Sequence, residues 1–315
     1  MKAIKRIAII GATGRLGAPV AIALAKHFQV RAIVRSPDKA KAMLPHDVEV
    51  FQADLRDITR LRIALNDIDA IYLNLATDTV DLNLPFYEER EGIRNLISAI
   101  EGLDIQYIAK IGALGAYPPA VEHIKKNMIP NLIRMEGHQL IADSGIPHTF
   151  FAPTHFMELL VLMIDKRFLQ WIGNTKVKIY WISVGDYAQQ VVNAFMHPEN
   201  RVEHCPVQGP EALSVRQAME QFVEHYDPTL KIRVAPLWVM KIIGFFNVKM
   251  RFVAHLFEYF GNHEDPFYAA RTWQDLGRPT TTLEEFARSL RQGNTVEGIK
   301  GAASDGSMSY NNTEL

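Results

Sequence analysis

The sequence predicts an α/β fold, a doubly wound parallel sheet of the Rossmann type with a small C-terminal α/β lobe. Two observations predict it. A short apolar run, 7–10, leads into three glycines spaced three apart, and a helical pattern follows at once. After that, β-branched runs alternate with helical patterns of about 10–15 residues, which is typical of βαβ units in a parallel sheet.

The glycine turn is the most informative motif. Gly11 allows a positive φ where the chain reverses, Gly14 has no Cβ to keep the backbone from a pyrophosphate, and Gly17 lets the helix pack against the strand. The N–H groups of the first helical turn then face the phosphates. The turn predicts dinucleotide binding, and the alternative is a tight strand–helix turn with no ligand. We expect contacts from Gly11, Thr13, Gly14, Arg15, Leu16 and Gly17.

The first half of the chain continues the alternating pattern. After a helix over 18–27, strand patterns stand at 30–34, 48–53, 70–75, 105–111 and 148–152. Helical patterns stand at 57–66, 86–101 and 127–143. Gly145 and Pro147 mark the end of the last of these helices. Together these segments predict a sheet covered on both faces, with right-handed crossovers.

The pattern after Pro153 is less regular. Strand patterns stand at 177–182 and 202–207, and helical patterns at 186–196, 214–226 and 237–260. Thr282 caps a last helix, with Glu285 completing a capping box. We therefore expect a dinucleotide-binding domain over 1–153 and a C-terminal substrate lobe over 154–292 that is interleaved with it. The polar tail over 293–315 is predicted to be disordered.

Composition limits the function classes. The net charge of −1 gives no reason to expect a nucleic-acid partner, and one cysteine, Cys205, excludes an internal disulfide. With no room for a signal peptide before the first strand, we expect a cytoplasmic protein. The apolar stretch 155–164 is too short to span a bilayer, and basic residues interrupt the stretch 237–260. We interpret both as buried, with aromatic residues of the second in the core, and expect no stable membrane insertion. The alternative for the second stretch is a shallow membrane contact.

The end of the second strand bears on the choice of dinucleotide. NAD enzymes carry an acidic residue there, whereas a basic residue meets the 2′-phosphate of NADP. Here Arg35 and Ser36 occupy this place and Arg15 is a second cation, so NADP(H) is favoured over NAD(H). The alternative for Arg35 is a solvated strand-end charge. Asp54, which ends the third strand, would accept from the adenine amino group or cap the following helix, and Leu55 follows it.

The chain resembles the NmrA-like branch of the atypical short-chain dehydrogenases/reductases. The resemblance rests on GATGRLG at 11–17, VRSPDKA at 34–40, SGIPHTFFAPTHFMELL at 144–160 and ISVGDYA at 182–188, and it extends to about residue 292. It implies a Rossmann domain with a small C-terminal substrate lobe. Some members of the family reduce quinones or related small molecules with NADPH, and others bind the dinucleotide as regulators or redox sensors.

The sequence departs from the catalytic pattern of short-chain dehydrogenases. Their tyrosine is followed four residues later by a lysine, which lowers the tyrosine pKa so that it can donate a proton. Here Val121 stands four residues after Tyr117, and Gly112 takes the apparent place of the serine. Ordinary carbonyl reduction is therefore not favoured. Hydride transfer to an electrophilic acceptor still fits, because positioning supplies much of the rate.

Candidate site residues lie at the carboxyl ends of the strands. Lys110 and Tyr117 are the catalytic candidates; the alternatives are a lysine whose amine reaches solvent and a packed loop tyrosine. The cofactor is expected to meet residues after the fourth and sixth strands, and the family resemblance places the latter at the nicotinamide end. These cofactor candidates are Asn74, Leu75, Ala76, Thr77, Pro153 and Phe156. Tyr117, His155 and Phe156 are expected to face the substrate, and no metal-ligand spacing is present.

Two functions remain open on the sequence. The first is an NADPH-dependent oxidoreductase that transfers hydride to a quinone-like or other conjugated small molecule. The second is a non-catalytic NADP-binding regulator or redox sensor that acts on a protein partner. A nucleotide-sugar epimerase is a weaker third hypothesis, since the missing tyrosine–lysine pair counts against it.

Overall fold

The protein is described from a computed structural model of residues 3–81, 83–124, 127–200 and 202–294. Most of the tail that was expected to be disordered, 295–315, lies outside the described residues. The chain divides into two compact units. The first comprises 1–154, 185–208 and 267–279, and the second comprises 155–184, 209–266 and 280–315.

The first unit contains the parallel sheet that the sequence predicts. Its strands are β1 (Arg6–Ile10), β2 (Gln29–Val34), β3 (Glu49–Gln52), β4 (Ala70–Leu73), β5 (Tyr107–Ile111), β6 (His148–Pro153) and β10 (His204–Val207). Their order in the sheet is β10-β6-β5-β4-β1-β2-β3, and every pair is parallel. The order therefore reverses beside β1, where β4 lies on one side and β2 on the other. This is the place where doubly wound sheets bind their ligands.

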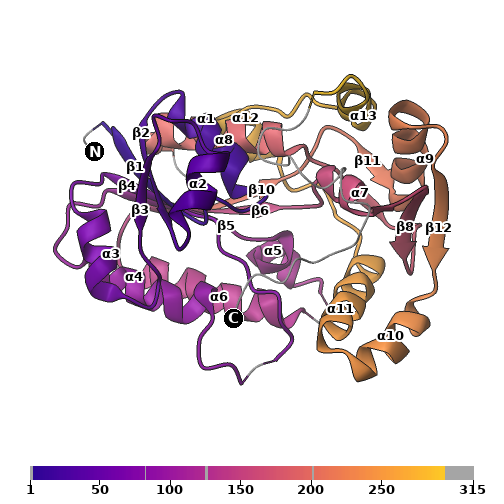
Figure 1. Cartoon of the computed structure of the whole chain (residues 1–315), viewed down its shortest axis with the longest axis horizontal. Coiled ribbons are helices and arrows are strands. Elements are labelled where there is room, and N and C mark those ends of the chain that lie inside the picture. Colours follow the sequence, from indigo (N-terminus) through magenta and orange to yellow (C-terminus); the bar gives the residue numbers. More distant parts are fainter. Residues whose placement is uncertain (1–2, 82, 125–126, 201, 295–315) are drawn as a thin grey trace. The chain divides into compact units, whose positions relative to one another are not determined.

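Helices cover both faces of this sheet. They are α1 (Gly17–Ala25), α2 (Pro37–Met43), α3 (Ile58–Leu65), α4 (Ile93–Ile100), α5 (Pro118–Val121), α6 (Ile129–Asp143), α8 (Val184–Met196) and α12 (Ala270–Leu276). Single turns are η1 (Glu88–Gly92, π-helical), η2 (Leu114–Ala116) and η3 (Pro198–Asn200). In Figure 1, α3, α4 and α6 lie along one face and α1 and α8 along the other.

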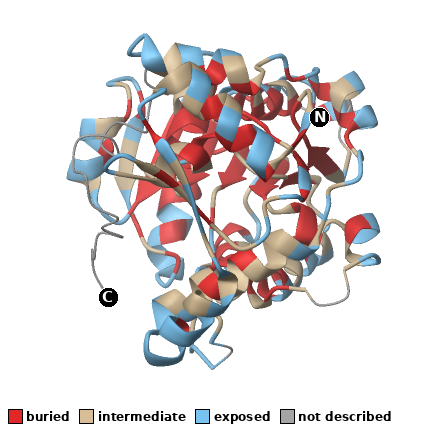
Figure 2. Ribbon diagram, turned by 90° about the vertical axis from the view of Figure 1, so that its right-hand side faces the viewer, coloured by how far each residue is buried: buried red, intermediate tan, exposed pale blue. Residues whose placement is uncertain are grey.

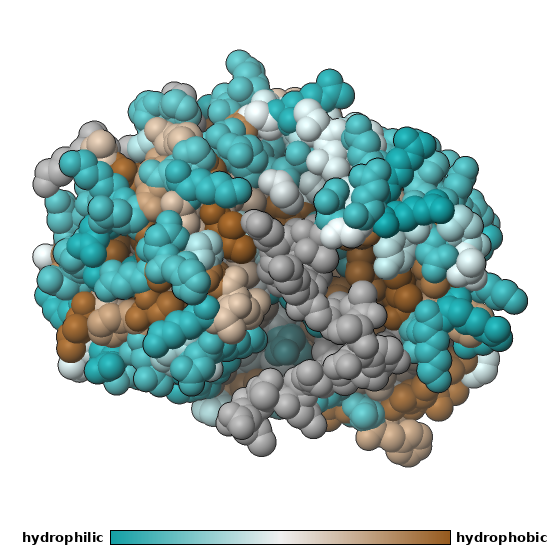
Figure 3. Space-filling model, turned by 45° about the horizontal axis from the view of Figure 1, so that its top comes forward, coloured by the Kyte–Doolittle hydropathy of each residue, from teal (hydrophilic) through white to brown (hydrophobic). Residues whose placement is uncertain are grey.

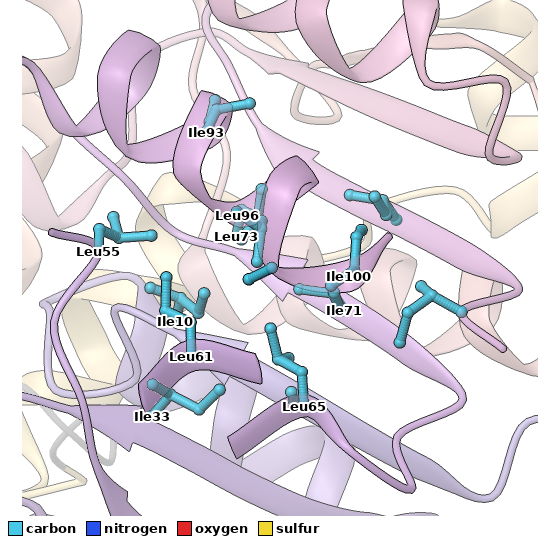
Figure 4. Packing of buried hydrophobic residues seen from close by; sticks show 14 of the residues in the cluster. Ile10, Ile33, Leu55, Leu61, Leu65, Ile71, Leu73, Ile93, Leu96 and Ile100 are labelled. Carbon is cyan, nitrogen blue, oxygen red and sulfur yellow. The ribbon is translucent and has the colours of Figure 1, made fainter. Parts of the chain in front are cut away.

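The core of the first unit sits between the sheet and the helices α3 and α4. Strand side chains alternate, so Ile71 and Leu73 point to this core while Tyr72 points to the other face, where it contacts Phe195 of α8. Figure 4 shows Leu61 and Leu65 of α3 and Ile93, Leu96 and Ile100 of α4 packed on Ile10, Ile33, Ile71 and Leu73. The burial colouring of Figure 2 shows the central strands buried and the helices exposed on their outer sides.

The second unit has its own core and two small sheets. Its helices are α7 (Glu158–Leu162), α9 (Val215–Tyr226), α10 (Leu237–Phe246), α11 (Val248–Asn262) and α13 (Leu283–Arg291). One sheet pairs β7 (Ile164–Asp165), β8 (Phe168–Ile172) and β12 (Lys231–Ala235), and the other pairs β9 (Lys178–Tyr180) with β11 (Ala212–Ser214). Its core holds Trp171, Trp181, Phe222, Phe257 and Phe286. The capping boxes at Ser214 and Thr282 are present.

The expected burial of the stretch 237–260 is wrong for its first half. The stretch forms two helices, α10 and α11, joined at Asn247, and Gly244 is the one residue of α10 that is buried. Phe257 lies in the core, whereas Trp238, Phe245 and Phe246 are exposed. The reason is that α10 packs on α11 along one face only, at Gly244. The apolar side chains on its other faces therefore stay exposed. No helix in the described part of the chain is both long and apolar enough to cross a bilayer.

Candidate nicotinamide-dinucleotide site

The turn after β1 needs its glycines. Gly11 has φ +89°, and a Cβ there would overlap the carbonyl oxygen of Asn74. A Cβ on Gly17 would overlap the carbonyl oxygen of Gly11, so α1 begins directly against the turn. Gly14 is less confined, because its Cβ would lie 3.0 Å from Nδ2 of Asn74, the end of a side chain, and 3.2 Å from the carbonyl oxygen of Gly11. The expected positive φ and close helix packing are both confirmed.

The amino end of α1 is open to an anion. Leu16 is the N-cap residue and makes no capping hydrogen bond through its side chain, and the first turn carries no acidic residue. The amide of Gly14 donates to Gly11 O (3.1 Å), and that of Ala18 donates to Gly14 O (2.9 Å). A helix start with no side-chain cap and no negative charge of its own suits a phosphate group.

Two buried polar atoms after β4 have no hydrogen-bond partner within the described residues. They are Oδ1 of Asn74 and Oγ1 of Thr77. Asn74 lies beside the glycine turn, with its amide bonded to Ile10 O at 2.9 Å and its Nδ2 close to Gly14. Buried polar atoms without partners are costly, so both atoms are suited to bonds from a ligand. The segment 74–77 therefore offers polar atoms to a ligand, and its contact with the ribose and nicotinamide of a dinucleotide stays a prediction.

The cations at the ends of β1 and β2 are exposed. Neither Arg15 nor Arg35 has an ion pair or side-chain hydrogen bond within the described residues. The carbonyl of Arg35 accepts from Gln52 Nε2 at 3.2 Å, and Ser36 is the N-cap residue of α2 without a side-chain cap bond. Since β1 and β2 are parallel neighbours, both guanidinium groups stand at the carboxyl edge of the sheet.

The structure decides one of the two interpretations of Asp54. The N-cap of α3 is Asp57, whose carboxylate accepts from Arg60 N at 2.9 Å, so the alternative that Asp54 caps this helix is wrong. Asp54 instead accepts from Arg56 N at 2.8 Å within its own turn. Leu55 is buried, and its carbonyl accepts from Asn95 Nδ2. The adenine contact stays a prediction.

Lys110 does not reach solvent, so that alternative is wrong. Its side chain is 0% exposed, and Nζ donates to Glu89 Oε1 (2.7 Å) and to Ile111 O (2.9 Å). Arg134 Nε lies 2.9 Å from the same carboxylate oxygen. Burial lowers the pKa of Lys110 to about 8, although Glu89 opposes this. The neighbouring cations hold the pKa of Glu89 below its usual value, so the carboxylate stays charged between them.

The apparent serine position is closed. A Cβ on Gly112 would lie 3.0 Å from Phe151 O and 3.1 Å from Cε1 of His138, and Gly112 N donates to Phe151 O at 2.6 Å. His138 stacks on Phe150 with ring centroids 4.0 Å apart, and burial keeps its pKa well below the usual value. A serine side chain at residue 112 would therefore crowd the His138 ring.

Tyr117 is half-buried at the N-cap of α5. Its ring contacts Tyr268 (5.5 Å between centroids) and His204 (6.1 Å). Partial burial raises the pKa of its hydroxyl, which is the opposite of the shift that a lysine four residues later would produce. These ring contacts agree with the alternative of a packed loop tyrosine. That Tyr117 faces the substrate stays a prediction.

The remaining candidates follow β6. Pro153 ends that strand in the first unit, and the second unit begins at His155. The ring of His155 lies against Phe260 (4.1 Å between centroids) and Trp181 (5.6 Å), and its buried Nε2 has no partner in the described chain. Burial lowers the pKa of His155 to about 4, so it is neutral at pH 7. Phe156 forms a bridge with Ile182.

Sequence reasoning missed the charged cluster around Lys110. Glu89 and Arg134 are 21 and 24 residues away from Lys110 along the chain, and no local pattern joins them. The one available signal was the charged run 88–91 at the start of a helical pattern that is otherwise apolar on one face. No group of residues suited to a metal ion is found in the ranges that the structure describes.

The described pocket of the first unit lies at the other end of the sheet. It has a volume of about 460 Å³. It is lined by residues before β1, between α1 and β2, and at the end of α8 and in η3: Ala3, Ile4, His27, Phe28, Phe195, Met196, Pro198 and Glu199. These residues flank the amino ends of the strands, opposite the glycine turn. This pocket is therefore not the dinucleotide site.

The fold and the glycine turn define a dinucleotide-binding protein of the Rossmann class. A profile of the NAD(P)H-binding family matches residues 11–198, and the chain belongs to this family. The expected resemblance to atypical short-chain dehydrogenases/reductases is thereby confirmed at the level of the family.

Individual proteins are similar over large parts of the chain. An NAD(P)H azoreductase of Xenophilus azovorans is 27% identical over 216 residues, covering 66% of this chain and 69% of the relative. Quinone oxidoreductase 2 of Escherichia coli is 34% identical over 150 residues, which is 45% of this chain and 46% of the relative. The crystal structure of the E. coli NADPH-dependent quinone oxidoreductase with NADPH superposes with a TM-score of 0.69 at 23% identity, covering 90% and 99% of the two chains. This last likeness confirms the fold.

Proposed function

We propose that this protein is an NADPH-dependent oxidoreductase that transfers hydride to a quinone-like or other conjugated small molecule. The observation that carries the proposal is an asymmetry within one site. The groups that a nucleotide needs are present: the start of α1 has no side-chain cap, and buried polar atoms of Asn74 and Thr77 have no hydrogen-bond partner in the described chain. The acid–base groups are missing, because Gly112 stands where a serine would crowd His138 and Val121 stands in place of the lysine.

Each part of the nucleotide end has a task. NADPH supplies a hydride when it is bound. The amides at the start of α1 hold the diphosphate, and Arg35 meets the 2′-phosphate with support from Ser36 and Arg15. Asn74 Oδ1 accepts a hydrogen bond from the ribose and nicotinamide end, and Thr77 Oγ1 accepts or donates one there. NADP(H) is preferred because the end of β2 offers a guanidinium group and no carboxylate.

The missing serine and the missing tyrosine–lysine pair indicate what kind of molecule accepts the hydride. A quinone or an azo compound is already electrophilic and takes hydride without a strong general acid, since water supplies the protons. Positioning over the nicotinamide then supplies much of the rate. The names of the relatives, an azoreductase and a quinone oxidoreductase, support acceptors of this conjugated kind.

The catalytic candidates take different roles in this proposal. Tyr117 keeps its proton at neutral pH, so its hydroxyl can donate a hydrogen bond to an acceptor oxygen. Lys110 is a positioning residue, because its buried amine acts on Glu89 and not on a substrate. His155 and Phe156 offer a neutral ring and an apolar ring to a flat substrate.

The second candidate is an NADP-binding regulator without turnover. The same observation favours it, because a protein that only senses the dinucleotide needs no serine, tyrosine or lysine. The two functions share every cofactor residue. They differ in whether bound NADPH is consumed when an acceptor is added.

The test is NADPH consumption, followed by absorbance, with a panel of quinones, azo dyes and conjugated carbonyls. Thr77→Val removes the unpartnered hydroxyl at nearly constant volume and should weaken NADPH binding about tenfold. Thr229→Val is the matched control, since that hydroxyl bonds Asp227 in the second unit. Consumption that fails with every acceptor, with tight NADPH binding, would replace the reductase by the regulator.

A further inference from the structure

The second unit presents an apolar surface on α10 that no part of the function above uses. We call it the α10 surface and define it by Trp238, Ile242, Phe245, Phe246 and Val248. Trp238 is 64% exposed, Phe245 77% and Phe246 84%. Figure 3 shows brown and tan atoms gathered at the lower right, in the place of α10 in Figure 1. Exposed apolar clusters of this kind mark interaction sites.

The spacing of these residues makes a stripe. Trp238, Ile242 and Phe245 follow each other at four- and three-residue steps, so they share one side of α10. Phe246 and Val248 extend the stripe across the turn into α11. A single exposed aromatic residue needs no explanation, whereas five apolar side chains in one place do.

The C-terminal end of α10, which carries Phe245 and Phe246, makes several contacts with α11. Gly244 rests on α11, where its Cβ would lie 2.8 Å from Cα of Arg251. Arg251 Nε donates to Gly244 O at 3.2 Å, and Asn247 Oδ1 accepts from Lys249 N at 2.9 Å. These bonds cap the end of α10 and the start of α11. The phenylalanines are therefore held outward by an ordered turn.

Basic residues outnumber acidic residues in the segment that carries the α10 surface. The segment 231–262 has five basic residues and one acidic residue, in a chain whose net charge is −1. All five basic residues are exposed, and Lys241 pairs with the single acid, Glu258, at 2.7 Å. The basic residues are Lys231, Arg233, Lys241, Lys249 and Arg251.

We propose that the α10 surface docks reversibly on a lipid bilayer that carries anionic phospholipid headgroups. Tryptophan and phenylalanine enter the interface between headgroups and acyl chains, while neighbouring lysine and arginine attract the anionic headgroups. α10 has ten residues, so the contact lies on the surface and does not span. A second copy is a poorer occupant, because a symmetric contact would bring the basic residues of both copies together.

The test is co-sedimentation of the full chain with vesicles. One set contains phosphatidylcholine alone, and the other contains equal parts of phosphatidylcholine and phosphatidylglycerol. We expect binding to the anionic vesicles that weakens with added salt, as charge attraction is screened. The double variant Phe245→Ser/Phe246→Ser should bind at least about tenfold more weakly, because the inserted apolar area is lost. Trp238 should shift its fluorescence to shorter wavelength only in the original chain.

The matched control is Ile63→Ser/Leu132→Ser, which removes two exposed apolar side chains from the first unit. It should bind vesicles like the original chain. Three results would overturn the proposal: no binding to anionic vesicles, equal binding by both double variants, or a dimer in light scattering that Phe245→Ser/Phe246→Ser abolishes. NADPH binding by the variants reports folding separately, so the proposed reductase activity is not at stake in this experiment.

Discussion

Lys110 and Glu89 form a fully buried ion pair, with Nζ 2.7 Å from Oε1. Arg134 reaches the same carboxylate, so one negative charge lies between two positive charges. Gly137 makes the arrangement possible, because any Cβ there would overlap the carbonyl oxygen of Glu89 and push α6 off η1. The cluster therefore joins β5, η1 and α6 beside the carboxyl edge of the sheet.

The first prediction concerns this cluster. Glu89→Gln leaves the buried amine of Lys110 and the partly buried guanidinium of Arg134 without a counter-charge, and it should lower the free energy of unfolding by roughly 3–5 kcal/mol. Lys110→Met should cost less, since Arg134 still pairs with Glu89. Urea unfolding measures both. A larger loss from Lys110→Met than from Glu89→Gln would show that the charge balance is not what stabilises the cluster.

The second prediction separates two glycines of the turn. Gly17→Ala forces a Cβ into the carbonyl of Gly11 and should cost roughly 3 kcal/mol of stability. Gly14→Ala meets the end of the Asn74 side chain at 3.0 Å and the carbonyl oxygen of Gly11 at 3.2 Å, so it should cost about 1 kcal/mol of stability, less than Gly17→Ala, while NADPH affinity falls. Thermal unfolding with and without NADPH measures the two effects. Unchanged NADPH affinity in a folded Gly14→Ala variant would contradict the site.

The third prediction concerns the dinucleotide. Arg35→Asp removes the guanidinium and adds a negative charge, which should weaken NADP(H) binding by about 1.5–3 kcal/mol and leave NAD(H) binding level or stronger. Lys26→Asp makes the same change of charge at the far end of α1 and should alter neither. Titration of each variant with both dinucleotides is the measurement. If Arg35→Asp weakens both alike, Arg35 does not select the cofactor.

The fourth prediction is a dependence of stability on pH. Burial lowers the pKa of His155 from 6.5 to about 4. Between these values the unfolded chain binds more protons, so this contribution is fully present above pH 6.5 and is lost as the pH falls towards 4. It amounts to roughly 3 kcal/mol at most. His155→Gln should lose less stability between about pH 7 and pH 5 than the original chain, and exposed His123→Gln should not differ from it. If His155→Gln and the original chain lose the same stability on acidification, His155 does not contribute to the dependence of stability on pH.

The sequence was enough for the parts of the fold that local chemistry determines. The turn at Gly11 follows from spacing, since only glycine suits φ +89° next to another backbone. The caps at Ser214 and Thr282 are likewise local, because each closes on a residue three positions later. These features depend on neighbours along the chain, and so a single sequence reveals them.

Features that depend on distant partners were not predictable. β8 and β12 pair in parallel although about 60 residues separate them, and no local pattern in either run points to the other. The Lys110 cluster needs three segments to meet. The exposure of Phe245 and Phe246 was not predictable for the same reason. The apolar composition of a helix indicates that it packs against another element, but it does not indicate which of its side chains that element covers.

The proposed mechanism has Tyr117 as a hydrogen-bond donor and no strong general acid. The most direct test is the rate of NADPH oxidation with a quinone acceptor in Tyr117→Phe, compared with Phe156→Ala and with NADPH affinity measured beside it. We predict a loss below roughly 100-fold for Tyr117→Phe, since that is the scale expected of a positioned general acid, and a larger loss for Phe156→Ala, because the proposal has its apolar ring face the substrate. A loss of about 100-fold or more for Tyr117→Phe at unchanged NADPH affinity would contradict the account.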